Sequence, residues 1–382
     1  MLLISTTEEL RTFCDKIADA PYMTVDTEFM RERTFWSILC LIQVASPEHE
    51  AMIDPMAAGI DLSPFYALLT KPDIVKVMHG CRQDIEIFHH EAGIMPNPVY
   101  DTQIAAMVCG FGDAVGYETL IRRTINVEID KSNRFTDWAR RPLSDAQLDY
   151  ALSDVTLLRD AYEVLTKQIE ETKRSAWVEE EMADLTDPRH YVQDPNEAWR
   201  RFKISDRRPR VFGTLIAVTK WRDEQAQKQN VPRRRILKDD TIRALAQQAP
   251  KDKQALSRMR GMPRGFEKSS QAESLLAAIK KGVATPAEDL PPLPELVVNR
   301  PGMGALVDLL KVLLKHCSDE NEVAPKLIGN VADLERIACD GEPKVASMRG
   351  WRFEVFGQHA LALKSGKLAL STADDKIVLI ER

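Results

Sequence analysis

The first half of the chain alternates between short apolar runs and longer stretches in which apolar residues recur every three or four positions. The short runs, rich in β-branched and aromatic residues, predict strands at residues 1–5, 22–29, 40–45, 50–54 and 74–79. The longer stretches predict helices at residues 8–20, 64–69, 84–92, 102–109 and 118–124. A further helix follows Ser144, which forms a capping-box pattern with Gln147, as Thr6 does with Glu9. Residues 1–187 are therefore expected to form an α/β domain, a mixed sheet flanked by helices.

The second half of the chain shows only helical patterns, and no strand is predicted after about residue 187. Residues 188–208 combine prolines with many charges and are interpreted as a linker. Residues 209–284 and 295–382 then repeat the same features in the same order, ending in Met259-Arg260-Gly261 and Met348-Arg349-Gly350. This repetition predicts two small all-α domains joined by the proline-rich residues 285–294, with chance similarity as the alternative.

The composition is that of a soluble globular protein with two or three domains, because 44% of its 382 residues are hydrophobic and 29% are charged. No apolar run approaches the roughly 18 residues that a membrane span needs, and the N-terminus lacks a signal-peptide pattern. The six cysteines are scattered without a CxxC pair, which argues against a zinc site or a disulfide framework. We therefore expect a cytoplasmic protein without a membrane partner.

The charges are distributed unevenly along the chain. Residues 200–268 contain 20 Lys and Arg but only 7 Asp and Glu, whereas the rest of the chain contains 32 basic and 51 acidic residues. A basic segment attached to an acidic body favours nucleic acid as a partner, with a solvated helical surface as the alternative. The candidate contacts to the nucleic acid backbone are Arg233, Arg234, Arg235 and Lys238, together with the arginines of residues 200–210.

Two carboxylates lie two residues apart in the predicted strand at residues 22–29. Asp26 and Glu28 share one face of that strand, since side chains alternate between the two faces. Two such acids repel each other and need protons or a cation, and oxygen ligands suit Mg²⁺ or Mn²⁺. An exposed edge strand with outward polar residues is the alternative.

Three further residues extend this acidic pattern. Asp84 follows the strand that ends at His79 and a turn at Gly80, where the sites of α/β proteins usually lie. Tyr150 and Asp154 are four residues apart and share one face of a predicted helix. The alternatives are an acid favoured by the helix dipole at residue 84, and a surface Asp with a half-buried Tyr in the later helix. The combination is much more specific than any of its parts.

The order D-x-E, then D, then Y-x₃-D resembles the tyrosine subclass of the DEDD exonuclease superfamily. The residues around these acids are similar to the bacterial ribonuclease D family. The similar segments are Val25-Asp26-Thr27-Glu28-Phe29, His79-Gly80-Cys81-Arg82-Gln83-Asp84, Asp101-Thr102-Gln103-Ile104-Ala105-Ala106, Thr136-Asp137-Trp138-Ala139-Arg140-Arg141-Pro142-Leu143-Ser144 and Tyr150-Ala151-Leu152-Ser153-Asp154-Val155. The two helical segments resemble HRDC domains, and the second is the weaker match. The resemblance covers essentially the whole chain, and all four acids are present.

The resemblance implies an RNase H-like mixed sheet and a site with two divalent metal ions, Mg²⁺ or Mn²⁺. It implies that Asp26, Glu28, Asp84 and Asp154 are the metal ligands and that Tyr150 orients the attacking water. A free phenol has a pKa of about 10, which suits water orientation better than general-base catalysis at neutral pH. Outside this set, Asp101 is interpreted as a helix N-cap and His79 as the end of a buried strand.

The implied activity is 3′-5′ exonuclease cleavage of RNA with release of nucleoside 5′-monophosphates. The implied partners are RNAs with a free 3′ end, especially transfer RNA precursors and other small structured RNAs, and the implied state is a monomer. Phe29 and Phe35 are candidates for stacking on terminal bases, with core packing as the alternative for each. Residues 1–187 alone are expected to keep the chemistry on short RNA but to capture structured RNA less well.

Three other functions remain to be compared. A DNA 3′-5′ exonuclease would share the acid pattern, and the contact to a 2′-hydroxyl that separates RNA from DNA is not visible in a sequence. A non-catalytic nucleic-acid-binding module is disfavoured because all four acids are present. A helicase is disfavoured because the chain has no GxxxxGK[ST] phosphate loop.

Overall fold

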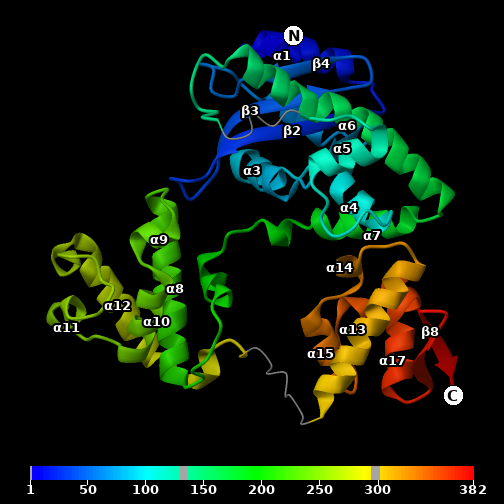
Figure 1. The fold of residues 1–382 in the computed structure, drawn as a ribbon. Helices are drawn as coiled ribbons and strands as arrows, with labels where there is room; N and C mark the ends of the chain where they lie inside the picture. The colour runs from blue at the N-terminus through cyan, green and yellow to red at the C-terminus, as the bar shows by residue number, and fades with distance from the viewer. Residues whose placement is uncertain (1, 130–135, 294–301) are drawn as a thin grey trace. The chain divides into compact units, whose positions relative to one another are not determined.

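The computed structural model describes residues 2–129, 136–293 and 302–382, and Figure 1 shows its ribbon. The chain forms two compact units. The first contains Met1–Glu28, Leu41–His190 and Leu296–Arg382, and the second contains Phe29–Cys40 and Tyr191–Glu295. Residues 29–40, which the sequence places inside the N-terminal domain, therefore belong with the first helical module, residues 191–295. In the described parts of the chain, no helix combines the length and apolar character needed to cross a bilayer.

The N-terminal domain is built on a six-stranded sheet in the order β1-β4-β3-β2-β5-β6. The strands are β1 (Leu3–Ile4), β2 (Tyr22–Met30), β3 (Ile38–Ala45), β4 (Glu50–Ile53), β5 (Val75–Met78) and β6 (Val99–Asp101). β3 and β4 pair antiparallel, whereas β1 with β4, β2 with β5 and β5 with β6 pair parallel. The mixed sheet expected from the sequence is confirmed.

Helices pack on this sheet and follow the predicted pattern closely. They are α1 (Thr7–Ile17), α2 (Ser63–Leu69), α3 (Arg82–Ala92), α4 (Thr102–Val108), α5 (Tyr117–Ile125), α6 (Asp145–Glu171) and α7 (Ser175–Leu185). Both predicted capping boxes are present, at Thr6 with Glu9 and at Ser144 with Gln147. The long helix α6 contacts β4 and β5 and lies along the sheet (Figure 1).

The first helical module has a hydrophobic core of its own. Its elements are η2 (Pro195–Arg201), α8 (Pro209–Lys228), α9 (Arg233–Ile236), α10 (Asp239–Gln248), α11 (Lys253–Ser257), η3 (Phe266–Lys268) and α12 (Ser270–Ala284). The main chains of α8 and α12 approach closely where glycine faces glycine. A Cβ at Gly213 would lie 2.5 Å from the carbonyl oxygen of Gly282, and one at Gly282 would lie 2.6 Å from that of Gly213. Only glycine permits this packing at the two positions.

The second helical module, residues 302–382, begins with the same order of helices. They are α13 (Met303–Glu320), α14 (Pro325–Ile328), α15 (Val331–Cys339), α16 (Gly350–Arg352), a π-helical turn (Phe353–Gly357) and α17 (Gln358–Lys364). The module packs on the N-terminal domain within the first unit. Trp351 stacks on Trp177 of α7 with ring centroids 4.3 Å apart, and the Ala324 amide donates to the Met107 carbonyl at 2.9 Å.

The expectation that no strand follows residue 187 is wrong for the end of the chain. β7 (Leu368–Ala373) and β8 (Lys376–Glu381) form an antiparallel hairpin, paired from Leu368 with Glu381 to Ala373 with Lys376. The turn residues Asp374 and Asp375 have φ values of 50° and 61°. Two left-handed residues form the tight turn that matches the twist of a hairpin, and Asp tolerates this conformation better than most residues. The second module is thus not all-α.

Candidate active site

Strand β2 carries the first two acids of the predicted site. Asp26 and Glu28 are both half-buried, and they share a face of the strand. Thr24, on the same strand, is buried, and its hydroxyl lies 2.9 Å from the carbonyl oxygen of Val155 on α6. Because Val155 follows Asp154 directly, this contact ties the strand with two acids to the helix with the fourth.

The other two acids come from helices. Asp84 lies in the first turn of α3 and is 7% exposed, and the hydroxyl of Thr27 donates a hydrogen bond to its carboxylate. Asp154 lies in the middle of α6 and is 9% exposed, with Tyr150 one turn before it. Burial argues against the surface alternative for Asp154, whereas the position of Asp84 in the first turn of α3 is also the one that the helix-dipole alternative describes.

A cavity of about 460 Å³ opens beside these residues. Its lining includes Asp26, Glu28, Tyr150 and Asp154, which the sequence predicted together. Asp84 does not line the cavity, and its carboxylate contacts Thr27 behind it. The structure therefore brings four of the five predicted residues to one cavity, and the fifth, Asp84, contacts Thr27 of its lining.

The acids change one another's protonation. Burial raises the pKa of Asp26 well above its usual value, and the charges of Asp84, Asp154 and Glu28 raise it further. Burial, together with the charges of Asp154 and Asp84, raises the pKa of Glu28 to about 8. Burial also raises the pKa of Asp84 to about 7, against the lowering effect of the Thr27 hydrogen bond. A cluster of mutually repelling carboxylates needs protons or cations to be stable at neutral pH.

The donor set fits a hard divalent cation in its chemistry. Every predicted ligand is a carboxylate, and Mg²⁺ and Mn²⁺ prefer oxygen ligands. Within residues 2–129, 136–293 and 302–382, no three His, Cys, Asp or Glu side chains are grouped closely enough to hold a metal ion as they stand.

Two aromatic residues also line the cavity, and sequence analysis did not assign them to the site. His79 directly follows β5, its Nδ1 lies 3.0 Å from the Thr102 hydroxyl, and its ring packs edge-on against Tyr117. The Tyr117 hydroxyl donates to the Ser153 carbonyl at 2.9 Å. No motif marked Tyr117, because a tyrosine at the start of an ordinary amphipathic helix carries no local signal of its role.

Asp101 is an N-cap, as predicted. Its carboxylate accepts hydrogen bonds from the amides of Gln103 and Ile104 at the start of α4. It also accepts from the amides of Gly80 at 3.0 Å and Cys81 at 2.9 Å. Asp101 therefore fixes the turn that leads from β5 to Asp84 and supports the site without lining it.

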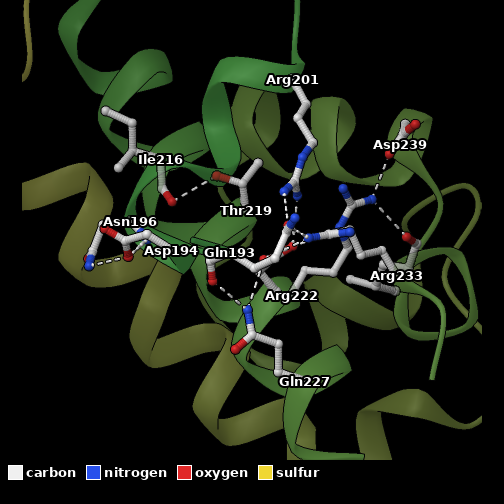
Figure 2. A network of polar contacts seen from close by, with 12 residues as sticks. Gln193, Asp194, Asn196, Arg201, Ile216, Thr219, Arg222, Gln227, Arg233 and Asp239 are labelled. Carbon is white, nitrogen blue, oxygen red and sulfur yellow. Dashed lines mark hydrogen bonds and ion pairs between the residues drawn. The ribbon is translucent and has the colours of Figure 1, made fainter. Parts of the chain in front are cut away.

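The predicted RNA contacts fall into two groups. Arg234, Arg235 and Lys238 are exposed on the first helical module. Arg233 is instead held beside the buried Asp223, in the polar network of Figure 2, and covers the ring of Phe35, with its guanidinium carbon 4.2 Å from the ring centroid.

The two phenylalanines predicted to stack on bases also differ in their surroundings. Phe35 is 4% exposed and lies in the hydrophobic core of the first helical module, which favours the packing alternative over base stacking. Phe29 is half-buried at the end of β2. Sequence analysis missed a further exposed basic group in the same module, on the segment after α11, at Arg258, Arg260 and Arg264.

Comparisons with known proteins show which family and fold this chain resembles. A family model described as 3′-5′ exonuclease matches residues 1–170, and one described as HRDC domain matches residues 213–279. Ribonuclease D of Nitrobacter hamburgensis is 46% identical over 382 residues, which is 100% of both chains, and Ribonuclease D of Jannaschia sp. is 46% identical over 99% of both. The crystal structure of Escherichia coli RNase D, an exoribonuclease involved in structured RNA processing, matches with a TM-score of 0.83 and 26% identity, covering 95% of this chain and 98% of that one.

Proposed function

Because this chain belongs to the ribonuclease D family and is a 3′-5′ exoribonuclease, we propose that it trims the 3′ ends of transfer RNA precursors and other small structured RNAs. The single observation that supports the proposed site is that Asp26, Glu28, Tyr150 and Asp154, which come from one strand and one helix, line the same cavity, with Asp84 bonded to Thr27 of its lining. Such a cluster is destabilising unless cations bind there, so it is retained for function rather than for stability.

The exonuclease family that matches residues 1–170 is metal-dependent. We assign Asp26, Glu28, Asp84 and Asp154 as ligands of two divalent ions, Mg²⁺ or Mn²⁺. When bound, such ions activate a water and neutralise charge on the phosphate. The four acids would hold the positive charge of these ions next to the scissile phosphate.

Tyr150 is assigned to orient the attacking water, since it lines the cavity one helical turn from Asp154. The water oxygen forms a bond to the terminal phosphorus while the bond from phosphorus to the 3′ oxygen of the penultimate nucleotide breaks. That oxygen takes up a proton, and the products are a nucleoside 5′-monophosphate and an RNA shortened by one residue.

Capture of structured RNA is assigned to the exposed basic residues of the first helical module. Arg234, Arg235 and Lys238 are exposed, and so are Arg258 and Arg260. Such side chains bind the phosphate backbone without reading sequence, because phosphates look alike in every RNA. Arg233 is left out of this set, because its guanidinium is engaged by Asp223 and Phe35.

The test is a time course on a 3′-extended transfer RNA and on single-stranded DNA of the same sequence, with Mg²⁺ or with EDTA. Asp26→Ala is run beside Glu48→Ala, a matched control that removes an exposed acid from the turn between β3 and β4. We expect stepwise 3′ shortening of the RNA that is lost with EDTA and with Asp26→Ala but kept with Glu48→Ala. If Asp26→Ala shortens the RNA at the parent rate, the assignment of Asp26 to the active site is wrong. If only the DNA is shortened, RNA is not the substrate.

A further inference from the structure

The segment that leads into α6 lies beside the tyrosine assigned to orient the attacking water. Residues 136–144 and α6 both belong to the first compact unit. Trp138 is 3% exposed, and its ring centroid lies 6.3 Å from that of Tyr150, with 32° between the two ring planes. That spacing is within the range in which aromatic rings attract each other. Trp138 therefore packs against the side chain of Tyr150, which lines the cavity.

Trp138 lies behind the tyrosine and not in the cavity. Among the described residues, Tyr150 is part of the cavity lining and Trp138 is not. The indole N–H of Trp138 is buried and has no hydrogen-bond partner in the part of the chain that the structure describes. An unpaired buried donor costs about 1–3 kcal/mol, which an apolar side chain at the same place would avoid. The presence of tryptophan here therefore favours a role of the large ring beyond stability.

Arg141 fixes the main chain that carries Trp138. Its guanidinium donates to the Trp138 carbonyl at 2.7 Å and to the Arg140 carbonyl at 3.0 Å. The same guanidinium makes a two-point contact with the carboxylate of Asp54, from Nε to Oδ2 at 2.8 Å and from Nη2 to Oδ1 at 2.7 Å. A two-point contact fixes direction as well as distance, and the planar fork of arginine provides it whereas lysine does not.

Asp54 connects this contact to the sheet. It directly follows β4 and is 7% exposed. Its amide donates to the carbonyl of Ile4 on β1 at 2.9 Å, and its carboxylate also accepts from the amide of Met56 at 2.9 Å. Because the main chain on both sides of the carboxylate is held in this way, Asp54 is a fixed point for the Arg141 guanidinium.

The segment is tethered on its other side as well. Gln147 closes the capping box with Ser144, and its Nε2 donates to the hydroxyl of Thr136 at 3.1 Å. Tyr150 follows Gln147 by three residues, which is about one turn of α6. Trp138 therefore lies between two tethered points of the chain, and its ring is held at a set place beside Tyr150.

We propose that Trp138 is a positioning residue for Tyr150, and that the ion pair of Arg141 with Asp54 holds Trp138 in place. The inference rests on the proposed role of Tyr150. The indole limits the rotamers of the tyrosine, so that the phenol meets the attacking water at one angle. Without the indole, Tyr150 loses a packing contact and its phenol samples a wider range of positions. A misplacement of about 1 Å is enough to lower a rate by up to about 100-fold.

The test is a double-mutant cycle in the full chain. Trp138→Leu and Arg141→Lys are each made in the parent and in Tyr150→Phe. Leucine keeps an apolar side chain in the core, and lysine keeps the charge opposite Asp54 but lacks the fork. Arg140→Lys is the matched control, because it makes the same substitution at the neighbouring exposed arginine. The readouts are kcat and KM on a short single-stranded RNA, with far-UV circular dichroism to check the fold.

We expect Trp138→Leu to lower kcat about tenfold in the parent but less than about twofold in Tyr150→Phe, with little change in KM. Arg141→Lys is expected to show the same pattern with a loss of about three- to fivefold in the parent. Arg140→Lys is expected to stay within about twofold of the parent. If Trp138→Leu does not fold, the Arg141→Lys pair of measurements decides.

A purely structural role of Trp138 predicts a different result. Loss of folded protein lowers kcat by the same factor whether or not the phenol is present. Equal losses in the two backgrounds would therefore overturn the inference and leave the proposed function in place. If Tyr150→Phe alone keeps the parent kcat, the proposed role of Tyr150 is wrong and the inference fails with it, so the two failures are distinguishable.

Discussion

The crowded acids predict that the metal-free protein loses stability as the pH rises from about 6.5 to 8. In the folded chain the pKa of Glu28 is raised to about 8, whereas a glutamate in the unfolded chain has its ordinary pKa of 4.5. The pKa of Asp84 is likewise raised to about 7 in the folded chain, from its ordinary value of 3.8. A carboxyl whose pKa is higher in the folded state stabilises the fold at low pH, and this contribution is lost as the pH rises through the folded value.

The size of the effect follows from these values. Each pH unit over which the folded chain keeps a proton that the unfolded chain has lost costs about 1.4 kcal/mol. From pH 6.5 to 8, Glu28 loses about 1.6 kcal/mol and Asp84 about 0.8 kcal/mol by this relation. The two groups influence each other, so we take about 2 kcal/mol in total, or roughly 4–6 °C in Tm for a unit of this size.

The window avoids two opposing groups. Burial lowers the pKa of His79 from 6.5, so its contribution to the pH dependence of stability falls mainly below pH 6.5. Burial lowers the pKa of Lys76 from 10.5 to about 8, so its contribution falls mainly above pH 8. The assay is thermal unfolding in EDTA at pH 6.5 and 8, repeated with Mg²⁺. Mg²⁺ is expected to stabilise more at pH 8, where the ligands are deprotonated. The reasoning is refuted if Glu28→Gln has the same pH slope as the parent, because the slope would then arise elsewhere.

Four other outcomes are expected. Asp154→Ala lowers kcat by roughly a thousandfold or more while far-UV circular dichroism stays unchanged; a fold lost in this variant would make Asp154 structural. Tyr150→Phe lowers kcat about 10- to 100-fold with an unchanged KM on short RNA, and a parent-like kcat would remove the phenol from the mechanism. Arg352→Ala leaves the buried Glu181 without its ion-pair partner and lowers the free energy of unfolding by about 2–4 kcal/mol in urea titrations; no change in midpoint would contradict this. Arg260→Ala weakens transfer RNA binding and lowers the slope of log affinity against log salt concentration by about one. An unchanged slope would show that Arg260 does not contact the RNA.

Local sequence signals predicted most of the elements because they depend on residues a few positions apart. Thr6 with Glu9 and Ser144 with Gln147 cap the helices that they predicted. The C-terminal hairpin was missed although its turn, Asp374-Asp375, lies between two apolar runs. That signal was local too, and the expectation of a second all-α domain overrode it.

The candidate site was predicted as a set of residues but not as a geometry. Spacing placed Asp26 with Glu28 and Tyr150 with Asp154, because strand and helix periods decide which side chains share a face. The order of these motifs resembled a known superfamily, and the resemblance joined them. No spacing predicted that Asp84 would contact Thr27 or that Tyr117 would line the cavity, since those contacts join separate elements.

The sequence by itself determined the strands and helices, their caps and the acidic motif, since each is specified within one or two turns of chain. The tertiary structure decided which charges and rings are available for function. Arg233 and Arg234 are neighbours in the sequence, yet one is engaged by Asp223 and Phe35 while the other is exposed. The Phe35 amide donates a hydrogen bond to the side chain of Asn230, which lies 195 positions later in the sequence. Burial and pairing depend on segments that only folding brings together, so no local pattern reports them.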